Sequence, residues 1–246
     1  MNYLTAINNI EITSCPHCRS TYICKYGHVK TRQRYKCKEC TRTFTSYTNK
    51  PWSNSKVDIS IWNRYLSLME NKLTLEECSR ILHINIKTAF NIRHKIMMAI
   101  EEVENKLLCG EVEVIRRRYY ENRKGSKRIH GDRKQYNLHF GIDNTHNTFL
   151  DLDTRNMSVK LAEEVLNRNI SNDAIILSSN NRFINLARCT IRKICPIKCI
   201  NACREYTCYE LWHEDFRGVA TRYIYRYYYW YKSRKNLKTI FYGACL

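Results

Sequence analysis

The chain has 246 residues, of which 43% are hydrophobic, which is enough for one large and one small folded part and excludes a disordered chain. Its 42 Lys and Arg residues against 23 Asp and Glu give a formal net charge of +19, which favours a polyanionic partner, with nucleic acid first. No apolar run approaches roughly 18 residues and the first residues lack a basic, apolar leader, so we expect no membrane partner and no secretion.

Residues 1–50 carry two C-x2-C pairs. Thirteen cysteines in a chain expected to remain inside the cell indicate metal binding rather than disulfides. Cys15 and Cys18 are followed, after eighteen intervening residues, by Cys37 and Cys40. Four thiolates at this spacing are typical of a structural Zn²⁺ site. We therefore predict a zinc ribbon over residues 1–50.

The same segment is basic and contains interleaved aromatic residues, a composition suited to contacts with DNA phosphates. Four side chains in its second half are expected to make these contacts: Arg32, Arg34, Lys36 and Lys38. The alternative is that the charge only keeps a small domain in solution.

Residues 58–106 predict a helical segment. Helical spacing of apolar side chains begins at Ile59, and Thr74 with Glu77 forms the T-x-x-E pattern of a capping box that starts a second helix. Asn85 is expected to cap a third helix. Two helices joined by a short connection, the last one basic near its start, resemble a helix-turn-helix, with an ordinary helical hairpin as the alternative. Its expected DNA-binding side chains are Lys87, Arg93 and Lys95.

Residues 109–246 predict an α/β domain. Strands are expected at 111–115, 135–143, 147–153 and 174–178, with an amphipathic helix in SVKLAEEVLNRNI. This order suits an RNase H-like layout of three antiparallel strands, a crossover helix and a parallel strand beside the first. A basic, Tyr-rich helix at 223–238 is expected to pack against this domain, with stacking on unpaired bases as the alternative. The fold class is therefore α+β with several domains.

Six fragments in this order resemble the zinc-ribbon DDE transposases of bacterial ISXO-type insertion sequences and their eukaryotic Merlin relatives. They are CPHC followed by RQRYKCKECTRTFT, then TLEECSRILHINIKTAFNIRHKI, GEVEV, HFGIDNTHNTFLDL, IILSSNNRF and FRGVATRYIYRYYYWY. The resemblance implies DNA cutting and joining by phosphoryl transfer on two metal ions, Mg²⁺ in an active enzyme, held by clustered carboxylates. It also implies terminal inverted repeats as the DNA partner and a homo-oligomeric assembly.

The family's catalytic positions are degenerate in this chain. The first catalytic Asp and the acid after it correspond to Ile115 and Arg116, and the second Asp corresponds to Ser179. Because Ile cannot ligate a metal and a neutral hydroxyl is a poor ligand for Mg²⁺, these positions indicate lost catalysis. Glu113 and Glu210 are the candidate remnants.

A second thiol cluster is a candidate metal site, with buried thiols on a helix as the alternative. Its members are Cys195, Cys199, Cys203 and Cys208.

Three interpretations follow from the sequence. The first is a transposase-derived, zinc-containing DNA-binding protein without catalysis, and the second is an active DDE-type enzyme with displaced carboxylates. The third is a zinc-ribbon transcription or interaction module. The expected location is the nucleus of a eukaryotic host, or the cytoplasm and nucleoid of a bacterial one.

Overall fold

The structure is a computed structural model, and it describes residues 12–29, 32–104, 106–122, 133–154, 156, 158–186, 193–216 and 218–245. Two compact units divide the chain. Unit 1 contains Met1–Ile100 and Arg234–Leu246, and unit 2 contains Glu101–Ser233. The last thirteen residues thus group with the N-terminal unit, although the sequence placed them in the domain at 109–246. None of the described helices is long and apolar enough to cross a membrane.

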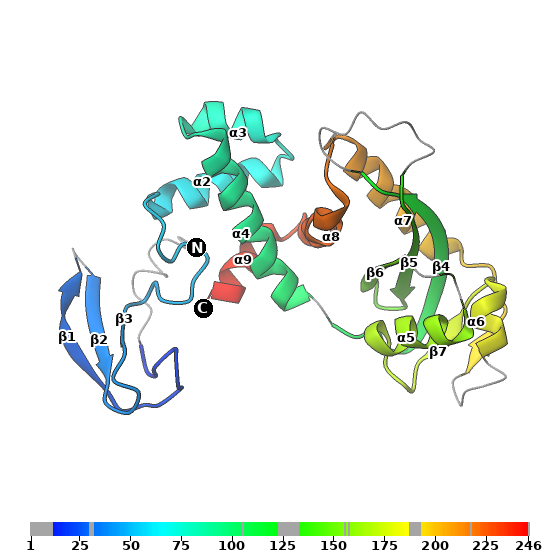
Figure 1. Ribbon diagram of the computed structural model, residues 1–246, viewed down its shortest axis with the longest axis horizontal. Helices are drawn as coiled ribbons and strands as arrows, with labels where there is room; N and C mark the ends of the chain where they lie inside the picture. The colour runs from blue at the N-terminus through cyan, green and yellow to red at the C-terminus, as the bar shows by residue number, and fades with distance from the viewer. Residues whose placement is uncertain are drawn as a thin grey trace. The chain divides into compact units, whose positions relative to one another are not determined.

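Unit 1 begins with a small antiparallel sheet in the order β1-β2-β3, shown in Figure 1. The strands are β1 (Ile23–Val29), β2 (Arg32–Cys37) and β3 (Thr43–Phe44). Their apolar cluster contains only Cys15, Cys37 and Phe44 as fully buried members. So small a core cannot stabilise the sheet alone, which fits the expectation that a metal ion supplies much of its stability.

Three helices follow, and local sequence signals set their boundaries. They are α2 (Ile59–Glu70), α3 (Leu75–Leu82) and α4 (Ile86–Glu104). The capping box at α3 is confirmed, because Thr74 N donates to the Glu77 carboxylate at 2.7 Å and Glu77 N donates to Thr74 Oγ1 at 3.3 Å. Asn85 Oδ1 accepts from Lys87 N at 2.8 Å, as expected of an N-cap. His83 ends α3 in the left-handed conformation, so the connection to α4 is short.

The C-terminal helix α9 (Leu237–Cys245) packs against α2 within unit 1. Tyr242 donates its hydroxyl to Asn63 at 2.9 Å, and Lys238 forms an ion pair with Glu70 at 3.0 Å. The ring of Phe241 lies 5.9 Å from that of Trp52. The chain's last helix therefore completes the helical core that the sequence placed at 58–106.

Unit 2 contains a mixed five-stranded sheet in the order β6-β5-β4-β7-β8. The strands are β4 (Glu111–Tyr120), β5 (Gln135–Asp143), β6 (Thr148–Asp153), β7 (Ile175–Leu177) and β8 (Ile194–Cys195). Strands β4, β5 and β6 pair antiparallel, whereas β7 runs parallel to β4 and β8 runs parallel to β7. This arrangement confirms the RNase H-like, α+β expectation. The sequence missed β8 and the second half of β4.

Helices cover both faces of the sheet (Figure 1). Val112 and Val114 pack with α5 (Val159–Asn169) and with Phe183 of α6 (Asn181–Leu186). Ile115 packs on the opposite face with α7 (Ile200–Glu214) and α8 (Ile224–Ser233). The two faces follow from strand alternation, which sends successive β4 side chains to opposite sides. Gly141 is needed in β5 because a Cβ there would overlap the ring of Phe149.

Candidate metal centre and degenerate catalytic positions

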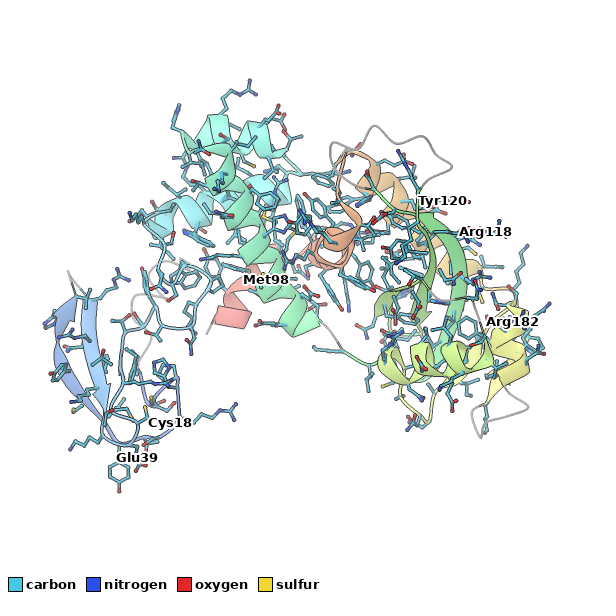
Figure 2. All side chains as sticks on the ribbon, viewed as in Figure 1. Cys18, Glu39, Met98, Arg118, Tyr120 and Arg182 are labelled. Atoms are coloured by element: carbon cyan, nitrogen blue, oxygen red, sulfur yellow. The ribbon has the colours of Figure 1, made fainter. Side chains whose placement is uncertain are left out.

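The four cysteines of the ribbon come together as a tetrad. Their sulfur atoms all lie within 4.8 Å of one another, and two pairs, Cys15–Cys40 and Cys18–Cys37, are 3.6 Å apart. Four sulfurs at about 2.3 Å from one Zn²⁺ would be separated by roughly 3.8 Å. The donor set and its spacing therefore fit tetrahedral zinc, and Figure 2 labels Cys18 at this end of the ribbon.

Two tight backbone turns hold the tetrad. Arg19 N donates to Cys15 O at 2.8 Å, and Cys37 N donates to Arg42 O at 3.0 Å. Arg19 and Thr41, which follow the two pairs, both have positive φ angles. Burial raises the pKa of the Cys37 thiol, but backbone N–H groups of Cys40 and Glu39 and neighbouring thiols lower it to about 7. At Cys18 the backbone N–H of Ser20 lowers the pKa, but burial and hydrogen bonds with the other three thiols raise it to about 12. The thiols therefore shift one another's pKa in opposite directions, and the turns favour the thiolate at Cys37.

The basic side chains of β2 lie against tyrosines. The Arg32 guanidinium stands 3.9 Å from the ring centre of Tyr47, and the Arg34 guanidinium stands 5.1 Å from that of Tyr26. Lys36 Nζ approaches the same Tyr26 ring at 5.3 Å. The predicted phosphate contacts therefore sit on ordered aromatic surfaces, while Lys38 extends into solvent from the turn beside the tetrad.

Helix α4 presents Lys87 and Lys95 to solvent, and Asn91 lies exposed between them. These three positions follow one another at intervals of four and therefore share one face of the helix. Asn91 was not among the predicted DNA-binding side chains, although its i, i+4 spacing from Lys87 places it on the same exposed face.

Arg93 is in the interior of unit 1 instead. It is 1% exposed and donates to Leu73 O at 2.7 Å and to Cys78 Sγ at 3.5 Å. A buried guanidinium with these partners is not available to a phosphate. We assign Arg93 to the helical core and leave it out of the DNA-facing surface.

Ile115 and Ser179 are the residues at which the resemblance implies two catalytic carboxylates. The parallel pairing of β4 with β7 ends at Glu113 and Leu177, and Ile115 and Ser179 each follow two residues later along the chain. The neighbouring Ser178 Oγ donates to Val114 O at 2.8 Å, which extends the pairing of the two strands. Ile115 is 5% exposed and packs against Cys199 and Ala202 of the α7 region. An apolar side chain thus occupies the place where the resemblance implies a carboxylate.

Glu113 is engaged at the start of α7. Its carboxylate accepts Ala202 N at 2.8 Å and Asn201 Nδ2 at 2.8 Å. No cap comes from the helix's own N-cap residue, Cys199. Glu113 therefore caps α7 from a neighbouring strand and neutralises the positive end of the helix dipole.

Glu210 is exposed on α7, at a position that the sequence register left open. It lies two and a half turns beyond Asn201, roughly 13 Å along the helix axis from the end that Glu113 caps. Glu113 and Glu210 are therefore too far apart along the helix to share one metal ion through these contacts. Arg217 of the F-R-G-V motif is outside the described residues.

Arg116 points to the face opposite Ile115. Its Nε and Nη2 atoms donate to Asn137 Oδ1 at 2.9 and 2.5 Å. It does not place its charge among the side chains of the α7 face. Arg117, which does lie on that face, donates to Cys203 Sγ at 3.2 Å.

The acids of β6 have partners of their own. Asp151 accepts Asn169 Nδ2 at 2.9 Å and pairs with Arg168 at 3.1 Å, and Asp153 lies 4.0 Å from the same guanidinium. Burial raises the pKa of Asp151. These contacts stabilise the sheet beneath α5.

The second group of cysteines is spread over three places. Cys195 is in β8, Cys199 is buried with its thiol donating to Leu177 O at 3.2 Å, and Cys203 and Cys208 follow on α7. Across the described part of the chain, the N-terminal tetrad is the only group of three or more Cys, His, Asp or Glu side chains that could hold a metal ion. Cys189, the neighbouring thiol, is outside the described residues.

Comparison with known proteins finds a distant similarity to a protein of a transposable element. No protein-family model matches the chain. The chain is 27% identical over 104 residues to an "Uncharacterized protein in transposable element ISH50" of Halobacterium salinarum, and this match covers 41% of the chain and 34% of that protein. The matched region thus spans about a third of that relative's length.

Among solved structures, the "Mos1 transposase paired-end complex with left transposon end" aligns over much of the chain. It covers 74% of this chain and 78% of its own, with 10% identity and a TM-score of 0.32. A score of this size carries no argument here, and the RNase H-like assignment stands on the strand order and directions of unit 2. The chain is therefore an α+β protein with a four-cysteine cluster and a distant similarity to a protein of a transposable element.

Proposed function

We propose that the protein is a transposase-derived, zinc-containing DNA-binding protein without metal-dependent strand-transfer activity. The observation that carries this proposal is the pair Ile115 and Ser179, which follow the last parallel pair of β4 and β7 by two residues each, at the positions where the resemblance implies carboxylates. Glu113, the nearest carboxylate on that face, has both oxygens occupied by α7. Two metal ions need several carboxylates that converge on one place, and this face offers an apolar core instead.

DNA binding rests on different features of unit 1. The ribbon carries Arg32, Arg34, Lys36 and Lys38 along β2 and directly after it, and α4 presents Lys87, Asn91 and Lys95 on one exposed face. Basic side chains supply phosphate contacts, whereas an amide on a helix that enters the major groove can read adenine. The formal charge of +19 favours the same partner.

The test uses the full, zinc-loaded chain. A random duplex library is selected for bound sequences, and the selected duplex is then incubated with Mg²⁺ or Mn²⁺ and examined for strand cleavage. Sequence-selective binding without cleavage is the expected result. Cleavage that Glu113→Gln abolishes would instead favour an active enzyme with displaced carboxylates, and zinc-loaded protein that binds no DNA would favour an interaction module.

A matched pair of variants locates the DNA contacts. Lys87→Gln/Lys95→Gln should weaken duplex binding and lower the slope of log K against log [salt] by about 2, because two phosphate contacts are lost. The control Lys160→Gln/Arg204→Gln removes the same charge from exposed positions on α5 and α7. If both double variants lost the same duplex affinity, the loss would result from the lower net charge alone, and this would contradict a specific interface on α4.

A further inference from the structure

A row of side chains on the α5–α6 face of β4 has no role in the function proposed above. Arg116, Arg118 and Tyr120 alternate with residues of the other face and therefore point to the same side of the sheet. From Arg116 to Tyr120 the row measures roughly 14 Å, at about 3.4 Å per residue. Arg118 is exposed and Tyr120 is 49% exposed.

Helix α6 adds a third arginine beside this row. Phe183 of α6 packs in the core of this face, and its ring lies 5.8 Å from that of His139. His139 is the direct cross-strand neighbour of Arg116. Arg182, the residue before Phe183, is exposed at the margin of the same face, where Figure 2 labels it together with Arg118 and Tyr120. We call Arg116, Arg118, Tyr120 and Arg182 the arginine–tyrosine stripe.

The stripe brings together three arginines, Arg116, Arg118 and Arg182, whose side chains form no ion pair with an acid in the described part of the chain. Asp151 and Asp153 on β6 are paired with Arg168. Burial lowers the pKa of Arg116, and the neighbouring charges of Arg118 and Arg182 lower it further. The repulsion among these guanidinium groups would be relieved by an anion bound between them.

The exposed ring of Tyr120 indicates which class of anion would fit beside the arginines. An exposed aromatic ring next to guanidinium groups suits a base that stacks while its backbone phosphates contact the arginines. A row of roughly 14 Å is long enough for about two or three successive phosphates of an extended single strand, because these are further apart than the roughly 3.4 Å per step along the axis of a duplex. A free phosphate would leave Tyr120 without a partner, and a paired base would be shielded from the ring.

We propose that the arginine–tyrosine stripe binds single-stranded nucleic acid, with Arg118, Arg182 and Arg116 on the phosphates and Tyr120 stacked on an unpaired base. The stripe lies wholly in unit 2 and shares no residue with the tetrad or with the exposed face of α4. Its existence does not depend on whether unit 1 binds duplex DNA.

The experiment measures fluorescence anisotropy of labelled oligothymidylate with the full, zinc-loaded chain over a range of salt concentrations. Arg118→Gln/Arg182→Gln should weaken binding about tenfold or more and lower the salt slope by about 1.4, since each phosphate contact on a single strand contributes about 0.7. Tyr120→Leu should weaken binding about tenfold with little change in slope, because stacking releases no counterions. Arg116 is left intact because Asn137 depends on it.

The control is Lys160→Gln/Arg204→Gln, which should leave the slope unchanged. Thermal unfolding and zinc content establish that each variant is folded. A slope unchanged in Arg118→Gln/Arg182→Gln, or lowered equally in the control, would overturn the phosphate contacts, and full affinity in Tyr120→Leu would overturn the stacking. Lys87→Gln/Lys95→Gln separates the two sites, because it should weaken duplex binding while the oligothymidylate slope persists. Oligouridylate in place of oligothymidylate shows whether RNA or DNA is preferred.

Discussion

The Glu113 carboxylate accepts the backbone N–H of Ala202 at 2.8 Å and so ties β4 to the first turn of α7. The Asn201 side chain donates to the other carboxylate oxygen at 2.8 Å. An acid that the sequence offers as a catalytic remnant therefore has a structural partner. A carboxylate near a helix N-terminus stabilises it by charge as well as by hydrogen bonding.

Glu113→Gln should lower the free energy of unfolding by about 1 kcal/mol, and Glu113→Ala by about 2 kcal/mol. Gln keeps an acceptor but loses the charge, whereas Ala leaves the N–H of Ala202 without its partner. Urea unfolding measures both variants. Glu111→Gln, which changes an exposed acid two residues earlier on the same strand, is the control and should have little effect. Equal stability of Glu113→Ala and the wild type would contradict the capping role.

Cys37→Ser should abolish zinc binding, since the tetrad loses one of four converging thiolates. The purified wild-type chain is expected to contain about one zinc per chain by elemental analysis, and a chelator should remove the ordered ribbon signals from an NMR spectrum. Cys24→Ser is the matched control, because the Cys24 thiol donates to Lys36 O instead of joining the tetrad. Full zinc content in Cys37→Ser would contradict the site.

Arg93 and Lys95 should separate stability from DNA binding. Arg93→Met removes a buried guanidinium that donates to Leu73 O, so the free energy of unfolding should fall by about 3 kcal/mol. Lys95→Gln changes an exposed residue on the same helix, so it should weaken duplex binding while stability changes by less than about 0.5 kcal/mol. Thermal unfolding and a binding isotherm on each variant provide the comparison, and the reverse pattern would refute both assignments.

His139 should make the protein less stable in acid. Both ring nitrogens are buried without a hydrogen-bond partner, and burial, followed by the charge of Arg116, lowers the pKa from 6.5 to about 4. The unfolded chain therefore binds one more proton than the folded chain between pH 6.5 and pH 4. The resulting loss of stability is absent above pH 6.5 and complete below pH 4, where it amounts to about 3 kcal/mol.

His139→Phe removes this titration. As the pH decreases, the free energy of unfolding of this variant should fall less steeply than that of the wild type. The two slopes should differ by about 1.4 kcal/mol per pH unit across the middle of that window. The remaining acid sensitivity comes partly from His213, whose pKa burial also lowers to about 4. A pH dependence identical to that of the wild type would show that His139 is already protonated or exposed in the folded state.

Local signals in the sequence determined much of the local structure of this protein, including the metal-binding tetrad and the boundaries of several elements. The spacing of Cys15, Cys18, Cys37 and Cys40 predicted the tetrad, because two tight turns bring each pair together wherever the sheet lies. Thr74 and Glu77 predicted the start of α3, since a capping box involves only neighbouring residues. The order of strands and helices predicted the RNase H-like sheet. Alternation along β4 also contained the signal that Arg116 faces away from Ile115.

Only the tertiary structure decided what several of these side chains do. Glu113 became a helix cap because β4 lies beside the start of α7, which is far away in the sequence. Arg93 became a core residue because it donates to the carbonyl of Leu73, in the turn before α3, and to the thiol of Cys78 in α3. Arg182 joined Arg118 because α6 folds over the face of the sheet that β4 presents. In each case the partner comes from a distant segment, so spacing and periodicity could not specify the contact.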